Sequence, residues 1–381
     1  MFSNWIRNLV GRKSRALADR RRSARRTPFL QLRLEVLEDR LVPALLTWTG
    51  AQDNLWNTNF SGSTNWSGNA IPQDGDDLVF PAGVANRTNT NNITGLDLNS
   101  IAFSGINYVI GGNAITLNTA NDLSDTSIAG ANALNLNITL SVDSTINVAQ
   151  ASTTLTLGGV LSGAGDVNKA GPGVLLLTQA NTYTGATNVN AGTILNGAVN
   201  ALPTGSDLAV LAGAVYDLNG FNQAVASLTG AGTVTNSSSS TAATLTIKPV
   251  SSDQFDGVLS GNLSLTKTGA GTETLAGANA NTFTGTTTVN DGTLNLNKTG
   301  AVAIPGDLVI GDTSSGALSD AVQLQANNQL AATSNITMNA DGILGFNAGV
   351  TQTIATLTMV GGAVDSVTGL SRDRVRNRAQ R

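Results

Sequence analysis

The densest group of acidic side chains is where catalytic or metal-binding chemistry would first be sought. Asp74, Asp76 and Asp77 lie together in the segment Pro-Gln-Asp-Gly-Asp-Asp, residues 72–77. Carboxylates that converge on one groove can act as the acid and base of polysaccharide cleavage, or can ligate calcium. Asp-Gly, however, is typical of a turn, and the sequence holds no EF-hand loop. The pattern therefore favours a turn over a site.

A second acidic fragment is weaker still. Gly163, Gly165 and Asp166 match part of a glycine-rich calcium repeat, but the match occurs once. The chain has no His and no Cys, which excludes Ser-His-Asp triads, His-based zinc hydrolysis and thiol nucleophiles. We therefore predict a protein that is not an enzyme, with no catalytic, cofactor-binding or metal-binding residue. The lack of disulfides does not exclude export.

Charge is strongly segregated along the 381 residues, whose net charge is −4. Residues 1–43 hold 11 Lys or Arg and 4 acids, and residues 371–381 hold 5 Arg and 1 Asp, whereas residues 44–370 hold 5 basic and 20 acidic residues. A nucleic-acid-binding domain would gather basic residues on one folded face. An acidic body between basic ends predicts no nucleic-acid partner.

The basic arm 1–43 has helical spacing at its start and then a run of arginines, so we expect it to be helical or disordered. Its end, LEVLEDRLVP at 34–43, resembles the N-terminal sorting segment of many bacterial surface and secreted proteins. A membrane-surface helix and a nucleic-acid tail are the alternative interpretations. The apolar run 41–46 is short and broken by Pro43, so no transmembrane segment is predicted.

Three of the four tryptophans, Trp48, Trp56 and Trp66, fall within residues 44–93. Large aromatic side chains can cover the unpaired terminal strands of a stacked β-structure, or can stack on sugar rings. We predict that 44–93 is an entry module and N-terminal cap.

Residues 94–370 read as short strands in which apolar and polar residues alternate. The clearest run places Leu134, Leu136, Ile138, Leu140 and Val142 on one expected face. Gly, Asn or Asp separates many such runs, and no amphipathic helix is evident after residue 44. Regular short strands indicate a sandwich, barrel, propeller or β-helix.

Internal repetition decides among these folds. Residues 159–197 and 257–297 are similar to each other, as in ANTYTGATNVNAGTI at 180–194 and ANTFTGTTTVNDGTL at 280–294. Both copies resemble the autotransporter-associated β-strand repeat, although Gln179 replaces a glycine of the pattern. The resemblance implies an all-β, right-handed parallel β-helix with three strands per coil. With about 20–25 residues per coil, residues 48–370 would form about 14 coils.

The repeat also assigns roles to two pairs of residues. Lys169 and Lys267 occupy equivalent positions beside Gly-x-Gly, so we interpret them as structural corner residues. Tyr183 and Phe283 are likewise equivalent and are expected to fill the interior or cover a corner.

The resemblance implies a passenger-type protein at the cell surface or outside the cell. We expect a structural or adhesive rod whose partners are cell-surface or extracellular-matrix components. A carbohydrate-binding or polysaccharide-degrading β-helix, or a fragment without activity of its own, is the alternative. The sequence ends at Arg381, about ten residues after the last expected strand, so no barrel of its own is expected. The tail 371–381 reads either as a charged gatekeeper against end-to-end stacking or as a truncation.

Overall fold

The computed structural model describes residues 43–312 and 319–366. They all belong to one compact unit, Val42–Arg381, and the other unit, Met1–Leu41, lies outside the described residues. The expected helical or disordered arm, residues 34–42 of the sorting segment, and the basic tail 371–381 also lie outside them.

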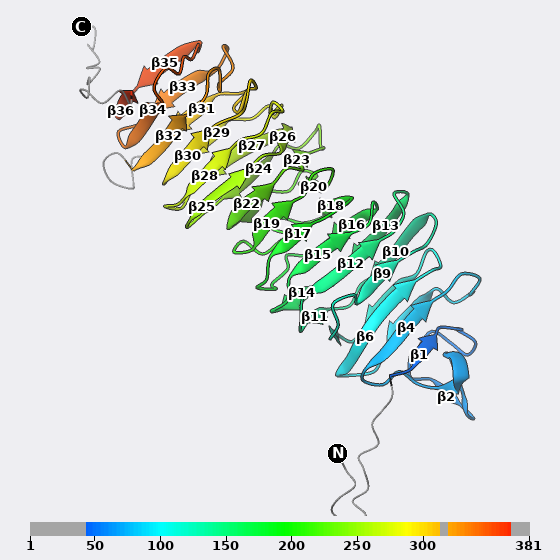
Figure 1. The fold of residues 1–381 in the computed structure, drawn as a ribbon. Coiled ribbons are helices and arrows are strands. Elements are labelled where there is room, and N and C mark those ends of the chain that lie inside the picture. Colours follow the sequence, from blue (N-terminus) through cyan, green and yellow to red (C-terminus); the bar gives the residue numbers. More distant parts are fainter. Residues whose placement is uncertain (1–42, 313–318, 367–381) are drawn as a thin grey trace, which may run out of the picture. The chain divides into compact units, whose positions relative to one another are not determined.

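The described residues form a parallel β-solenoid of about 13 turns, close to the 14 predicted (Figure 1). The largest of its three main sheets has 18 strands. These strands are β1 (Leu45–Thr47), β4 (Asp76–Phe80), β6 (Leu96–Phe103), β8 (Ile115–Leu117), β9 (Leu123–Asp125), β11 (Ile138–Leu140), β12 (Ser144–Val148), β14 (Leu161–Gly163), β15 (Val167–Ala170), β17 (Thr187–Val189), β19 (Asp207–Val210), β22 (Ser227–Gly230), β25 (Ser252–Phe255), β28 (Thr272–Leu275), β30 (Thr293–Leu296), β32 (Asp320–Leu324), β34 (Gly342–Phe346) and β36 (Ala363–Ser366).

Two further sheets complete the turns. The nine-stranded sheet contains β5 (Thr88–Asn91), β7 (Val109–Gly112), β10 (Gly130–Leu134), β13 (Thr153–Leu157), β16 (Val174–Leu177), β18 (Thr193–Asn196), β20 (Val215–Asp217), β23 (Thr233–Asn236) and β26 (Val258–Gly261). The seven-stranded sheet contains β21 (Gln223–Val225), β24 (Ala243–Ile247), β27 (Leu263–Lys267), β29 (Thr287–Val289), β31 (Leu308–Ile310), β33 (Asn335–Met338) and β35 (Thr356–Met359). Only β2 (Asn59–Phe60) and β3 (Ser63–Thr64) form an antiparallel strand pair among the described residues.

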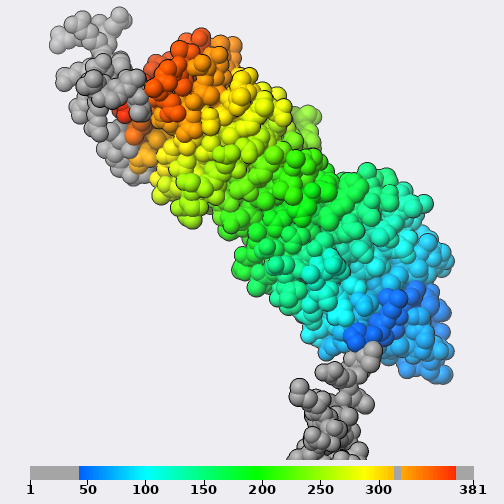
Figure 2. All heavy atoms as spheres, viewed as in Figure 1, coloured from blue at the N-terminus to red at the C-terminus, as the bar shows by residue number. Residues whose placement is uncertain are grey.

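Strands of consecutive turns pair in register, as the predicted coil requires. Val167 pairs with Thr187, and Thr187 pairs with Leu208, so these turns are 20 and 21 residues long. Turns elsewhere lengthen at their corners: Thr293 pairs with Ala321, 28 residues later. Figure 2 shows the result as bands of colour that follow one another in chain order over the surface.

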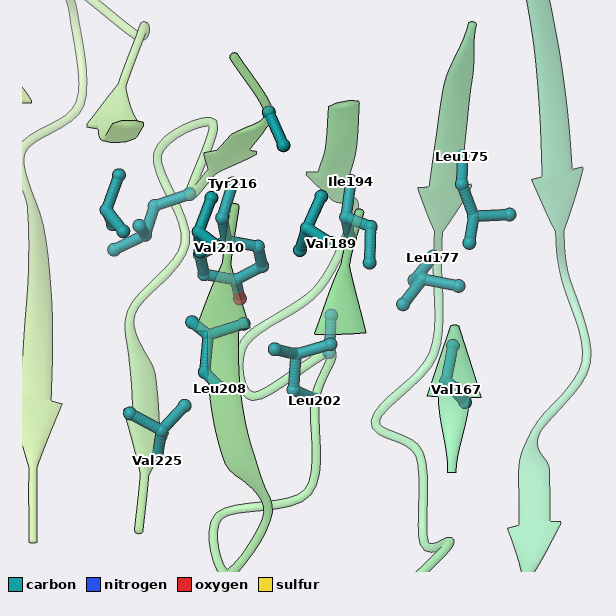
Figure 3. Close-up of a cluster of buried hydrophobic side chains, with 14 of the residues drawn as sticks. Val167, Leu175, Leu177, Val189, Ile194, Leu202, Leu208, Val210, Tyr216 and Val225 are labelled. Carbon is teal, nitrogen blue, oxygen red and sulfur yellow. The ribbon is translucent and has the colours of Figure 1, made fainter. Parts of the chain in front are cut away.

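The core lies inside the turns and is built by alternation. In β13 the side chains of Thr153, Leu155 and Leu157 are buried, while those between them are partly exposed. Figure 3 shows how Leu and Val side chains from adjacent turns pack on one another along the interior. Burial of each such side chain contributes about 1.5–3 kcal/mol, so the stacked apolar column is a main source of stability.

One expected strand is corrected. The alternating run from Leu134 to Val142 is not one strand, because β10 ends at Leu134 and β11 covers only Ile138–Leu140 in another sheet. The inward alternation continues around the corner through buried Leu136, but Val142 is 42% exposed. A solenoid keeps the period of two while it changes sheets, so periodicity alone did not reveal the corner.

Helical structure is nearly absent, as predicted. Within 43–312 and 319–366 the one helical element is the 3-10 turn η1 (Ser67–Asn69). Among the same residues, no helix is long and apolar enough to cross a membrane.

The two repeat copies lie on different faces of the solenoid. In the first copy, β15 and β17 belong to the 18-stranded sheet; their counterparts β27 and β29 belong to the seven-stranded sheet. Likewise β16 and β18 lie in the nine-stranded sheet, whereas their counterparts β28 and β30 lie in the 18-stranded sheet. The second copy is therefore displaced by one face around the axis.

Candidate functional site

The acidic segment at 72–77 is hydrogen-bonded to its own backbone and to neighbouring segments of the chain. The buried carboxylate of Asp76 accepts from the backbone N–H of Ala44 (2.8 Å) and of Gln73 (2.9 Å). Asp74 accepts from the backbone of Asp97, and Asp77 accepts from the Ser100 hydroxyl. The three carboxylates thus have separate partners, which fits the predicted turn.

The isolated Gly-x-Gly-x-Asp fragment also connects adjacent turns. Gly163 has φ +106°, and a Cβ there would stand 2.1 Å from the backbone oxygen of Leu140. The Asp166 carboxylate accepts from the backbone N–H of Ala186 at 2.7 Å. The fragment therefore allows adjacent turns to stack closely and joins them by a hydrogen bond.

The two repeat lysines are buried corner residues, as predicted. The Lys169 amine donates to the backbone oxygens of Ala170, Gly171 and Ala191, at 2.7–3.2 Å. The Lys267 amine donates in the same way to Thr268, Gly269 and Asp291. Both side chains are 0% exposed, and desolvation lowers the pKa of each amine to about 8. Each amine satisfies carbonyls of two successive turns.

A third buried lysine was not predicted from the sequence. Lys298 donates to the backbone oxygens of Gly257 and Ala276, each at 2.8 Å. Burial lowers the pKa of its amine to about 8. Lys298 lies outside the repeat pattern, so its spacing carried no signal of burial.

Two carboxyl groups with raised pKa values are sealed inside the solenoid. Desolvation raises the pKa of Glu273 to about 9, with repulsion from Asp253 adding to the shift and Lys267 opposing it. Desolvation raises the pKa of Asp122 to about 6, although its carboxylate accepts from the Ser144 hydroxyl. Both side chains are 0% exposed.

The tryptophans of the entry module form one buried aromatic cluster. The ring centroids of Trp48 and Trp56 lie 5.1 and 5.5 Å from that of Trp66, and Phe80 packs on all three. Each indole N–H donates within the protein, to Asn86, Asn89 and Trp56 respectively. No tryptophan of this cluster offers a ring face for a sugar, which favours the cap.

A shallow depression of about 510 Å³ beside the first repeat copy is lined by residues 180–184 and 200–205. Its floor includes Tyr183, which is 1% exposed, and its counterpart Phe283 is equally buried. The nearby Asn181 amide uses its oxygen on Leu161 N–H and its NH₂ on the Ala201 oxygen. These polar groups hold turns together and are not free for a ligand.

The outer face of the seven-stranded sheet carries a regular row of side chains. One position in six successive strands presents a β-branched side chain outward, and five of the six are threonine. They are Thr246, Thr266, Thr288, Val309, Thr337 and Thr358. We call this set the threonine ladder. Adjacent strands lie about 4.8 Å apart, so the hydroxyls repeat at that spacing except where Val309 interrupts the row.

These features define a class: a parallel β-solenoid whose turns carry a repeated module with a buried corner lysine. The family model called passenger-associated-transport-repeat matches residues 167–195 and 265–296. Both matches fall within the copies found in the sequence. The chain therefore carries the autotransporter-associated repeat, and the resemblance is confirmed.

One curated relative extends the comparison. Over 152 residues the chain is 40% identical to the "Adhesin BmaC autotransporter" of Brucella suis biovar 1 (strain 1330). The aligned part is 39% of this chain but 4% of that protein. No solved structure gives a significant match.

Proposed function

We propose that this chain is a non-enzymatic, passenger-type segment of a cell-surface or extracellular adhesive protein. The threonine ladder is the observation that carries the proposal, because it presents a row of threonine hydroxyls, interrupted only at Val309, at the spacing of the strands. The similarity to a protein named as an adhesin supports the same interpretation.

The ladder suits a partner that is itself extended. A single exposed hydrogen bond contributes only about 0.5–1.5 kcal/mol, so useful affinity needs many contacts made together. Cell-surface or extracellular-matrix components are the proposed partners. A polysaccharide is the second candidate, because its repeating hydroxyl groups could pair with a repeating row of threonines.

The burial of the perturbed acids supports a non-enzymatic role. Glu273 and Asp122 have the raised pKa values often found in catalytic acids, yet neither is exposed. A general acid must reach the substrate to within hydrogen-bond distance. Their environment therefore fits structural roles.

Substitution within the ladder tests the proposal. The purified chain is applied to immobilised matrix proteins, to cell envelopes and to a glycan array. Thr288→Arg, at the centre of the ladder, should weaken binding by tenfold or more. Thr193→Arg, on the partly exposed face of the nine-stranded sheet, is the matched control and should bind like the native chain.

The outcomes are separable. Loss of binding by Thr288→Arg alone, with circular dichroism unchanged, supports the ladder as the binding face. Equal effects of both variants, or no binding at all, would contradict it. Release of soluble sugars from a bound polysaccharide would contradict the non-enzymatic role.

We also propose that residues 1–43 serve export, that 44–93 cap the solenoid, and that 371–381 form a basic tail. The buried tryptophan cluster supports the cap. The sorting role predicts that a chain lacking 1–43 stays inside the producing cell. Normal export of that shortened chain would refute it.

A further inference from the structure

Three aspartates converge at one corner near the C-terminal end of the described solenoid. Asp312 follows β31, Asp320 begins β32, and Asp341 immediately precedes β34. One carboxylate oxygen of each lies within 4.8 Å of the other two. Because Asp320 pairs with Gly342, the cluster joins two successive turns.

Two of these side chains are buried. Asp320 is 0% exposed and Asp341 is 3% exposed, whereas Asp312 is at the surface. Neither carboxylate oxygen of Asp341 has a hydrogen-bond partner among the described residues. Burying a carboxylate costs free energy unless a proton, a cation or hydrogen bonds compensate its charge, so Asp341 needs a partner.

The nearby lysine is already committed elsewhere. Lys267 is close enough to feel the charge of Asp320, but its amine donates to three backbone oxygens. No Lys or Arg forms an ion pair with Asp341 in the described part of the chain.

The backbone makes room for the carboxylate of Asp341. Gly311 has φ +92°, and a Cβ at that position would lie 2.2 Å from Oδ1 of Asp341. Glycine at 311 thus lets this carboxylate approach the chain just before Asp312. The three carboxylates can therefore converge only because position 311 carries no side chain that would block Asp341.

We propose that Asp312, Asp320 and Asp341 bind one calcium ion, which fastens two successive turns together. The ligands are all hard oxygens, which suit calcium and magnesium better than zinc or copper. Two oxygens bound to one Ca²⁺ at about 2.4 Å can be up to about 4.8 Å apart, which accommodates the observed cluster. Calcium also tolerates the irregular geometry of a corner, whereas Mg²⁺ demands a near-ideal octahedron. This inference does not rest on adhesion.

Calorimetric titration of the full chain with CaCl₂, after removal of metals with EDTA, tests the site. We expect one ion per chain and a higher Tm with calcium than with EDTA. Asp341→Asn should weaken binding by at least tenfold. In EDTA the same variant should melt no lower than the native chain, because it removes an uncompensated buried charge.

Asp291→Asn is the matched control, since it removes a carboxylate at the corner of the preceding turn but outside the cluster. It should bind calcium like the native chain. Asp312→Asn is a second test at an exposed position, and it should also weaken binding even if Asp341→Asn folds poorly.

Two results would overturn the proposal. One is the absence of Ca²⁺ binding by the native chain at millimolar concentration. The other is unchanged calcium affinity in both Asp312→Asn and Asp341→Asn.

Discussion

At the scale of single residues, buried ionisable groups define where this solenoid departs from a purely apolar core. Glu273 occupies the inward position that Leu175 holds in the first repeat copy, and both are 0% exposed. The carboxyl is kept in its protonated form by desolvation, since its pKa is raised from 4.5 to about 9. The repeat pattern therefore accepts a neutral acid in place of a leucine.

Replacing Glu273 by leucine should stabilise the protein, and increasingly so as the pH rises. Between about pH 4.5 and 9 the unfolded carboxyl releases its proton while the folded one retains it, so the native chain loses stability over this range. A tenfold change in a proton-binding constant corresponds to about 1.4 kcal/mol, so the gain near pH 9 should reach several kcal/mol. Denaturant unfolding of both chains at pH 4.5 and 8 measures this.

The reverse substitution is a matched test. Leu175→Glu should destabilise the first copy, more at pH 8 than at pH 4.5. A stability difference between Glu273→Leu and the native chain that does not depend on pH would show that Glu273 titrates normally.

The corner lysines predict an opposite kind of mutational effect. Lys267→Met keeps most of the length of the side chain but leaves three backbone oxygens without their donor. Each buried, unsatisfied group costs about 1–3 kcal/mol, so we expect a loss of at least about 3 kcal/mol. Lys248→Met, at an exposed position, should change the unfolding free energy by less than about 0.5 kcal/mol. Equal unfolding curves for the two variants would refute the capping role.

At the scale of elements, corners decide how closely turns can stack. Gly171 and Gly213 both have positive φ, of +73° and +83°. A Cβ at Gly171 would stand 2.3 Å from the Val148 oxygen of the preceding turn, whereas Gly213 has open space around it. Glycine at 213 is therefore required only by the positive φ, whereas glycine at 171 is required both by the positive φ and by the close contact with the preceding turn.

Alanine substitutions at Gly171 and Gly213 should distinguish the cost of the positive φ from the cost of the backbone clash. Gly213→Ala carries only the cost of a left-handed backbone, about 1–2 kcal/mol. Gly171→Ala adds a clash with backbone, so it should destabilise the chain clearly more, and Tm measurements can compare the two. Similar Tm values would mean that the corner at Gly171 can move away from its neighbour.

At the scale of the whole solenoid unit, each turn is stabilised by its contacts with the neighbouring turns. The aromatic cluster runs from Trp48 through Phe80 to Phe103 and Tyr108, so it spans the first turns. In a solenoid each turn contacts only its neighbours, and damage at one end should spread over a limited distance. The entry module should therefore protect the first turns most.

Trp66→Ala tests this coupling. Truncating a buried tryptophan costs about 3–5 kcal/mol. Hydrogen exchange should quicken in strands β1 to β7, while protection in β27 to β34 should stay near the native level. Uniform loss of protection along the solenoid would show that it unfolds as one unit instead.

The sequence alone determined the parallel β-solenoid, the two repeat copies and the local roles of their shared residues. Alternation with a period of two sets which side chains point inward, and a lysine repeated beside Gly-x-Gly marks a corner. These are local properties, so they could be inferred for Lys169, Lys267, Tyr183 and Phe283 and were found in the structure.

Only the tertiary structure decided what meets across turns. Asp312, Asp320 and Asp341 are separated along the sequence by corners of variable length, so spacing could not predict their convergence. The sequence could not predict on which face of the solenoid each repeat copy lies, for the same reason. Turn lengths vary: Val215 pairs with Thr233, 18 residues later, whereas Thr293 pairs with Ala321, 28 residues later. The summed length of the intervening turns sets how far the second copy is rotated from the first. The copies are consequently related by a non-integral number of turns, because each corner absorbs extra residues without disturbing the register of the strands.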